Sequence, residues 1–212
     1  GISLATHIAK CAGVSDRKFE DIESDIKSLN EKSFPVLDDA RGEEMAQRIL
    51  KAREEADSVG GVTETVICGT PAGVGEPWFD SVESVISHAA FSLGGVKGVE
   101  FGAGFAAADM KGSECNDPLR VSDGRIVTTT NNNGGVNGGI TNGMPIVFRC
   151  AVKPTPSIAQ TQDTVDFLKN ENTQLSIHGR HDPAIIRRIC PVLDSVAALC
   201  VADMLSLRYG TD

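Results

Sequence analysis

A glycine- and asparagine-rich stretch, TTTNNNGGVNGGITNG, runs from Thr128 to Gly143 and sets the first limit on the fold. Glycine loses more conformational freedom on ordering than any other residue, and asparagine hydrogen-bonds its own backbone in turns. Neither residue suits a helix or a central strand at this density. The sequence therefore predicts a long, ordered, irregular region here, with regular secondary structure on either side.

Helical periodicity dominates the chain before this loop. Apolar residues recur at three- and four-residue spacing from Phe19 to Leu29, which predicts one amphipathic helix in a first third that is helical and polar. A second helix begins at Asp38 or Asp39 and is ended by Gly60-Gly61. Its charged face is expected to be a solvated surface. A third helix begins with a capping box of Asp80 and Glu83 and stops at Gly94-Gly95.

Strand patterns occur in three places. β-Branched residues over 62–67 and apolar residues over 96–101 predict two strands, and strict alternation over 146–152 predicts a third. These strands are interleaved with the helices, and no repeat or linker separates them. We therefore expect one domain, residues 1–212, of the α+β class with mainly antiparallel pairing.

The C-terminal part is predicted to be helical. Asp182 is placed as a helix N-cap, with Pro183 at the first helical position. Pro191 is expected to start or kink a second helical run, because proline lacks the N–H that a helix interior uses.

The acidic charge balance argues against two classes of partner. The 20 Lys and Arg against 29 Asp and Glu give a net charge of −9 and a pI near 4.9. Bulk charge of this sign repels nucleic acid and anionic membranes. No apolar run approaches the ~20 residues that span a bilayer, and no signal peptide is visible. We expect no nucleic-acid and no membrane partner, so that any bound anion must be held by local cations.

The cysteines and histidines give no metal-binding pattern. The six cysteines are scattered without a C-x-x-C pair, and the four histidines do not fall at zinc-ligand spacing. We therefore expect reduced cysteines, a cytoplasmic protein and no metal site. His88, on the predicted third helix, is expected to be a core histidine, whereas the context of His7 assigns it no role.

The segment GRHDP, residues 179–183, is the first candidate for chemistry. Arg180, His181 and Asp182 offer a cation, a titratable ring and a carboxylate just before a predicted helix N-terminus, where backbone N–H groups favour an anion. Such a corner can hold a phosphate and supply a base. The alternative is that Asp182 only caps the helix and Arg180 only lies on the surface.

Two further segments suit a phosphate-bearing ligand. The Asn/Gly loop lets a ligand approach backbone N–H groups closely, although it lacks the strand-to-helix context of a dinucleotide fingerprint. The KPTPS segment, Lys153 to Ser157, places one cation and two hydroxyls on a stretch that its prolines stiffen. The alternatives are a flexible surface loop for the first and an edge turn with an exposed lysine for the second.

Taken in order, six strings resemble the C-terminal part of chorismate synthases over nearly the whole chain. They are GVGEPWFDSVES from Gly73, VKGVEFGAGF from Val96, GSECND from Gly112, TNNNGGVNGGITNGMPI from Thr130, KPTPS from Lys153 and GRHDPAIIRRICPVLDSVAAL from Gly179. The resemblance implies elimination of phosphate from 5-enolpyruvylshikimate 3-phosphate (EPSP) to give chorismate, a lyase reaction that requires reduced FMN, with NADPH as the associated reductant. It also implies antiparallel sheets packed against central helices and a homotetramer.

The resemblance implies a role for each matching residue. FMN contacts correspond to Gly94, Gly95 and Gly138, and the flavin pocket is lined by Lys153, Pro154, Thr155, Pro156 and Ser157. Arg180 corresponds to an arginine on ligand phosphate or flavin, Asp182 to a carboxylate that helps deprotonate flavin N5, and Arg188 to a substrate-binding arginine. Ala184 stands where the family usually has Cys. The cations available for the anionic ligands are Lys97, Lys153, Arg180, Arg187 and Arg188.

Two family motifs do not occur in this sequence. They are a G-H-x-x-G-rich segment and an R-x-S-x-R-E-T stretch, which supply catalytic histidines and substrate-binding arginines in the family. We therefore expect an incomplete fold and a chain that is inactive alone. The alternative function is a non-catalytic core that folds and self-associates, with weak or no flavin binding.

Overall fold

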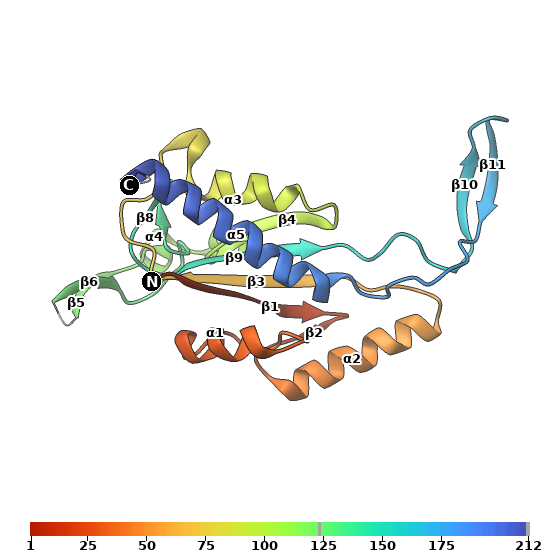
Figure 1. Cartoon of the computed structure of the whole chain (residues 1–212), viewed down its shortest axis with the longest axis horizontal. Coiled ribbons are helices and arrows are strands. Elements are labelled where there is room, and N and C mark those ends of the chain that lie inside the picture. The colour runs from red at the N-terminus through yellow and green to blue at the C-terminus, as the bar shows by residue number, and fades with distance from the viewer. Residues whose placement is uncertain (123, 211–212) are drawn as a thin grey trace.

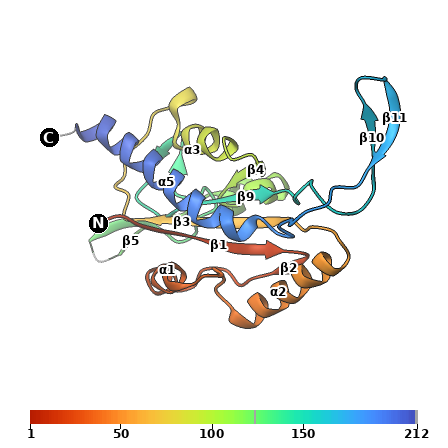
Figure 2. The same ribbon diagram turned by 45° about the vertical axis from the view of Figure 1, so that its right-hand side comes forward.

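The computed structural model describes residues 1–122 and 124–210 and has three layers (Figure 1). A five-stranded antiparallel sheet, in the order β2-β1-β3-β9-β4, forms the middle layer. Its strands are β1 (Ser3–Cys11), β2 (Val14–Ser15), β3 (Gly61–Cys68), β4 (Val96–Phe101) and β9 (Ile146–Val152). The turned view separates the two helical layers on its opposite faces (Figure 2). They contain α1 (Ile22–Glu31) and α2 (Asp39–Glu54) on one side, and α3 (Val82–Phe91) and α5 (Ile186–Tyr209) on the other.

The shorter elements lie at the two ends of the sheet. The glycine-rich region carries η2 (Gly104–Asp109), α4 (Gly112–Cys115), β5 (Leu119–Ser122), β6 (Arg125–Thr128), β7 (Val136–Asn137) and β8 (Ile140–Thr141), while η1 (Trp78–Asp80) precedes α3. At the other end, β10 (Gln162–Asp166) and β11 (Glu171–Leu175) form a hairpin that projects as an arm (Figure 1). The predicted long irregular region is thus ordered by short hairpins.

The main core lies between the sheet and the α3–α5 layer. Ile67, Ile146 and Phe148 of the sheet pack there against Ile86 of α3 and Leu193 of α5, and all five side chains are buried. Burial of such side chains contributes about 1.5–3 kcal/mol each. Because this layer fixes α3 and α5 against the strands, the chain segments that enter and leave them have defined positions.

A row of charged side chains crosses the sheet on its other face. His7, Glu64, Arg149 and Glu100 are neighbours in register on β1, β3, β9 and β4. The contacts along the row are 3.4 Å from His7 to Glu64, 3.1 Å from Glu64 to Arg149 and 2.6 Å from Arg149 to Glu100. Asp16 ends the row, 2.8 Å from His7, and accepts the backbone N–H groups of 37 and 38. This face therefore carries paired charges.

The α+β class and the antiparallel pairing are confirmed, but several local expectations were wrong. The first third is not helical throughout, because β1 occupies residues 3–11. The side chain that caps α3 is Ser81 rather than Asp80. Pro191 does not start a second helix, since it lies inside α5. His88 is exposed rather than a core residue, because it lies on the side of α3 away from the sheet.

The helix α5 also differs from the sequence expectation about apolar runs. Among the described residues it is long and apolar enough to cross a membrane, with a mean hydropathy of 1.7 over the best window, of which 33% is buried. In this structure α5 packs against β1 and α3.

Candidate functional site

The GRHDP segment connects the hairpin arm to α5 and does not begin the helix. α5 starts at Ile186 after an N-cap at Ile185 that has no side-chain bond, so the predicted cap at Asp182 was wrong. Oδ1 of Asp182 accepts the N–H of Ala184 at 3.1 Å, and Oδ2 lies 3.0 Å from Nε of Arg188. The carboxylate thus holds a local turn and an arginine one turn into α5.

Its neighbour His181 has a defined proton on one ring nitrogen. Nε2 of His181 lies 3.0 Å from the carbonyl oxygen of Ile177. A carbonyl oxygen only accepts, so Nε2 donates and Nδ1 is left to accept or to take up a proton. Arg180, in contrast, has no side-chain hydrogen bond or ion pair within the described part of the chain.

The KPTPS segment lies beside the turn after α3. The N–H of Lys153 donates to the carbonyl oxygen of Gly95 at 2.9 Å, which joins two of the expected flavin-contacting segments. Oγ of Ser58 donates to the carbonyl oxygen of Thr155 at 2.7 Å. Oγ1 of Thr155 is buried without a hydrogen-bond partner among the described residues, and such a group needs a partner.

Backbone contacts bring the GRHDP segment to the same place. The N–H of Val59 donates to the carbonyl oxygen of Pro183 at 2.8 Å, next to the Ser58 contact. A cavity of about 210 Å³ is lined by both segments, including Ser157, Arg180 and Asp182. The structure therefore brings together the residues that the sequence placed at 153–157 and 179–183.

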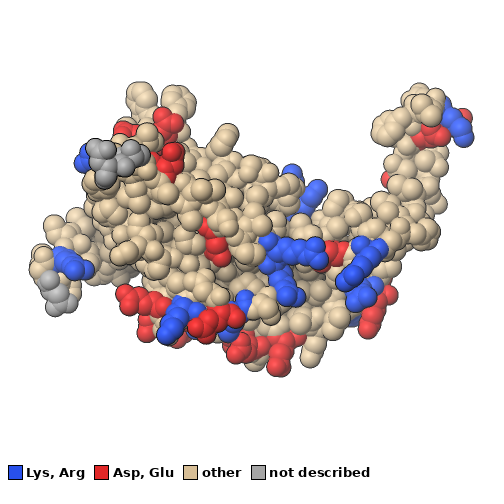
Figure 3. Space-filling view, viewed as in Figure 1, with Lys and Arg blue, Asp and Glu red and all other residues tan. Residues whose placement is uncertain are grey.

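A second cavity, of about 400 Å³, lies on the adjoining surface and is rich in arginine. Its lining consists of Leu50, Arg53, Arg180, His181, Asp182, Pro183 and Arg188. Lys and Arg side chains gather where α5 begins, toward the base of the arm (Figure 3). In a chain of net charge −9, such a local excess of cations creates a site for an anion.

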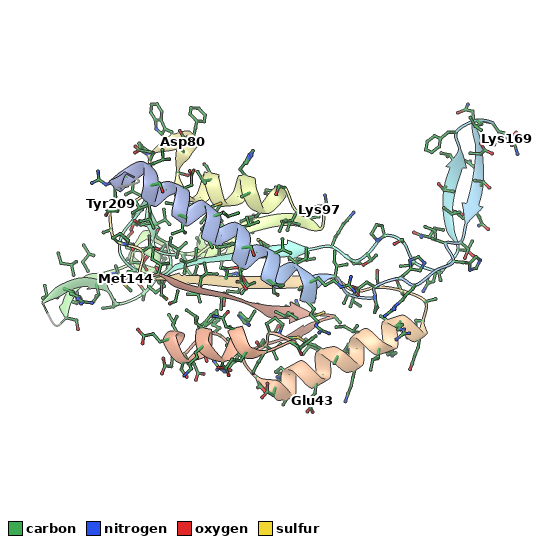
Figure 4. All side chains as sticks on the ribbon, in the orientation of Figure 1. Glu43, Asp80, Lys97, Met144, Lys169 and Tyr209 are labelled. Atoms are coloured by element: carbon green, nitrogen blue, oxygen red, sulfur yellow. The ribbon has the colours of Figure 1, made fainter. Side chains whose placement is uncertain are left out.

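Gly138 lies at the other end of α3 from the rest of the expected flavin residues. Lys97 and Asp80 mark the opposite ends of α3 (Figure 4). The loop residue Gly138 belongs to the Asp80 end, because the N–H of Val82 donates to the carbonyl oxygen of Gly139 there. The ten residues of α3 separate the two ends by about 15 Å. Within one chain, therefore, the structure does not bring Gly138 to the other expected flavin residues.

The structure adds Arg53 and Ser58, which the sequence did not point to. Arg53 sits in a helix whose charged face is typical of a solvated surface, and only its place in the cavity distinguishes it. Ser58 follows the end of α2 in a short turn. The segment DSVGG, which joins a polar helix to a buried strand, could have pointed to Ser58, whereas no local signal distinguishes Arg53.

All six cysteines are free, and burial raises the pKa of Cys11 to about 11 and that of Cys150 to about 12. Within residues 1–122 and 124–210 no group of three or more His, Cys, Asp or Glu side chains is arranged to hold a metal ion.

The sequence of the chain matches a known protein family. The sequence profile of the chorismate synthase family matches residues 1–206. The chorismate synthase of Methanosarcina acetivorans is 43% identical over 212 residues, which are 99% of this chain and 57% of that protein. The chorismate synthase of Korarchaeum cryptofilum is 51% identical over 166 residues, 77% of this chain and 46% of that protein.

A solved structure shares the fold. The crystal structure of a chorismate synthase superposes with a TM-score of 0.77 at 27% identity, and the match covers 100% of this chain and 59% of the solved one. The chain thus spans 57% of the length of the first of these relatives. Profile, relatives and fold agree, and this chain belongs to the chorismate synthase family.

Proposed function

We propose that this chain contributes to the elimination of phosphate from EPSP to give chorismate, with reduced FMN as cofactor. The observation that carries the proposal is that backbone contacts join the 94–95, 153–157 and 179–183 segments beside a cavity that Ser157, Arg180 and Asp182 line. EPSP carries a phosphate and two carboxylates, and FMN carries a phosphate. The unpaired guanidinium of Arg180 is suited to such groups, because it donates in a planar fork.

The residues of this region fit a flavin phosphate or ring edge. Oγ1 of Thr155 is buried and has no hydrogen-bond partner within the part of the chain that the structure describes. Ser157, two residues along the chain, lines a cavity together with Arg180. We assign Lys153, Thr155, Ser157 and Arg180 to FMN. Gly95 approaches the side-chain atoms of Ile185 closely, so a Cβ at that position would meet Ile185 Cδ1 at 2.8 Å. Reduced FMN, when bound, supplies the electron density that assists loss of phosphate.

The reaction removes phosphate and a proton from C6 of the ring, so the site has to stabilise an anion and accept a proton. Arg180 and Arg188 supply the positive charge for the leaving phosphate. Asp182 already accepts from Ala184 and Arg188. A carboxylate has about four lone-pair sites, so it can still receive a proton from a ligand held in the cavity. Nδ1 of His181 is a second acceptor in the same cavity.

Turnover and flavin binding test the proposal separately. EPSP would be offered with photoreduced FMN under anaerobic conditions, and chorismate would be followed by its absorbance. Flavin binding would be measured on a separate sample with oxidised FMN, whose fluorescence is quenched on binding. Turnover that Arg180→Gln abolishes supports the proposal. Quenching without turnover supports the alternative of a non-catalytic core. The absence of both quenching and turnover would contradict a flavin site in this chain.

Self-association and location belong to the same proposal. We propose a homotetramer in the cytoplasm, in line with the family resemblance. Sedimentation velocity over a range of concentrations would give the oligomeric state. A monomer at every concentration would contradict it.

A further inference from the structure

We propose that Arg53 is a binding residue for the phosphate group of a ligand, acting with Arg180 and Arg188. The inference deepens the proposed function and rests on it only for the identity of that ligand. Arg53 lines both the 210 Å³ and the 400 Å³ cavity. The larger one contains three guanidiniums against a single carboxylate, Asp182.

The charge partners on α2 set Arg53 apart. Arg41 and Arg48 pair with Glu44 within α2, and Lys51 pairs with Glu55, the residue that follows the helix. Arg53, in the last turn of α2, forms no ion pair or side-chain hydrogen bond within residues 1–122 and 124–210. On a helix face that is only solvated, these cations would be expected to pair alike. Arg53 is the exception, and it is the one that lines the cavity.

The end of α2 is held firmly at this site. After Arg53, Ala56 adopts a left-handed conformation with φ +58°, which ends the helix and turns the chain. The segment that follows is fastened by the hydrogen bonds of Ser58 to Thr155 and of Val59 to Pro183. Nε2 of Gln160 adds a bond to the carbonyl oxygen of Glu55 at 2.8 Å. Three bonds thus fix the backbone that carries Arg53.

The chemistry of the cavity favours a phosphate dianion. Guanidiniums bind phosphate oxygens in pairs of parallel hydrogen bonds. Three arginines line this cavity from different elements, α2, the GRHDP segment and α5. A cavity of 400 Å³ also has room for the organic part of a phosphate ester. Arg188 also pairs with Asp182 through Nε, so among the described residues Arg53 and Arg180 are the two guanidiniums of this cavity without an ion pair, and Arg188 keeps its other N–H groups for a ligand.

The experiment uses inorganic phosphate as the probe. The melting temperature of the chain would be followed against phosphate, with chloride at matched ionic strength as the reference. Arg53→Gln is expected to weaken phosphate binding about tenfold, because it removes charge-assisted hydrogen bonds. Arg48→Gln is the matched control, because it removes the same charge from the same helix and is expected to retain wild-type affinity. Arg53→Lys is expected to lie between them, since it keeps the charge and loses the fork.

Two further arms identify the ligand. If Arg53→Gln weakens the binding of FMN but leaves the binding of riboflavin, which has no phosphate, at the wild-type level, the residue is assigned to the flavin phosphate. A raised KM for EPSP with unchanged FMN affinity assigns it to the substrate phosphate. The inference is overturned if phosphate does not stabilise the wild type, or if Arg53→Gln and Arg48→Gln respond alike. Since the phosphate arm needs no turnover, its result is independent of whether the chain catalyses the proposed reaction.

Discussion

Nδ1 of His7 lies 2.8 Å from Oδ2 of Asp16, and both side chains are buried. Burial opposes a charge on the ring, yet the hydrogen bonds to Asp16 and Glu64 outweigh it, and the pKa of His7 is raised above 6.5. The pKa values of Asp16 and Glu64 are lowered by the same contacts, against the opposing effect of burial. The fold therefore favours the protonated form of His7 more than water does.

The first prediction is a pH dependence of stability. A raised histidine pKa contributes stability that is complete below about pH 6.5 and is lost as the pH rises through the folded value. The lowered carboxyl pKa values contribute stability that is present above about pH 4 and is lost as the pH falls. Urea unfolding between pH 4 and 9 should therefore give a maximum near pH 5–6.5. His7→Gln should remove the decline above pH 6.5, whereas His88→Gln, at an exposed position, should retain it.

A second prediction concerns the carboxylate of the GRHDP segment. Asp182→Asn keeps an oxygen for the N–H of Ala184 but loses the charge that pairs with Arg188. Turnover of EPSP should fall by about 10²-fold or more if this group takes up a proton, while FMN affinity stays within a factor of about three. Stopped-flow kinetics and flavin titration measure the two effects. Asp163→Asn, on the hairpin arm, is the control and should leave both unchanged.

The third prediction compares two leucines of α5. Leu193 is buried in the main core, whereas Leu199 is 71% exposed. Leu193→Ala should reduce the free energy of unfolding by about 2–5 kcal/mol, because it removes buried methyl groups and leaves a cavity. Leu199→Ala should change it by less than about 0.5 kcal/mol. Equal losses in urea unfolding would mean that the exposed face of α5 is covered in solution.

A fourth prediction separates backbone strain from steric overlap at two glycines. Gly102 and Gly124 both have positive φ, +54° and +74°. A Cβ at Gly102 would overlap the backbone of Asn132 and Gly134, whereas nothing lies near one at Gly124. Gly124→Ala should cost about 1–2 kcal/mol from the left-handed conformation alone. Gly102→Ala should cost about 1–3 kcal/mol more, from the overlap. Similar melting temperatures for the two variants would exclude the overlap.

Elements with a clear period could be predicted from the sequence. Residues 96–101 form β4 at the expected positions, between glycines at 95 and 102. Residues 146–152 form β9, because alternate residues face the core. In contrast, β1 has consecutive buried residues from Ala5 to Ile8, so burial on both faces removes the alternation that identifies a strand. The arm hairpin was missed for the opposite reason, since neither of its faces is buried.

Two segments of the candidate site could be identified from the sequence, because each is a short motif of consecutive residues. Lys153 to Ser157 and Arg180 to Asp182 were identified from local residue types, and the structure brings the two segments together. The role of Asp182 as a cap was wrong, because its carboxylate binds Arg188 and the turn at Ala184 instead. Arg53 could not be predicted, since its difference from Arg48 depends on where α2 ends in space.

The charged row across the sheet has a consequence for how the chain folds. It joins His7, Glu64, Arg149 and Glu100, whose contacts span most of the sequence. Contacts between residues so far apart require closure of long loops, which slows folding. His7 has a local partner in Asp16, but Glu64 and Glu100 lack their arginine until β9 arrives, and burying a charge without its partner is strongly unfavourable. The sheet is therefore expected to form late and in one cooperative step, and a nascent chain that ends before Arg149 holds β1 and β3 without the cation that joins them to β4.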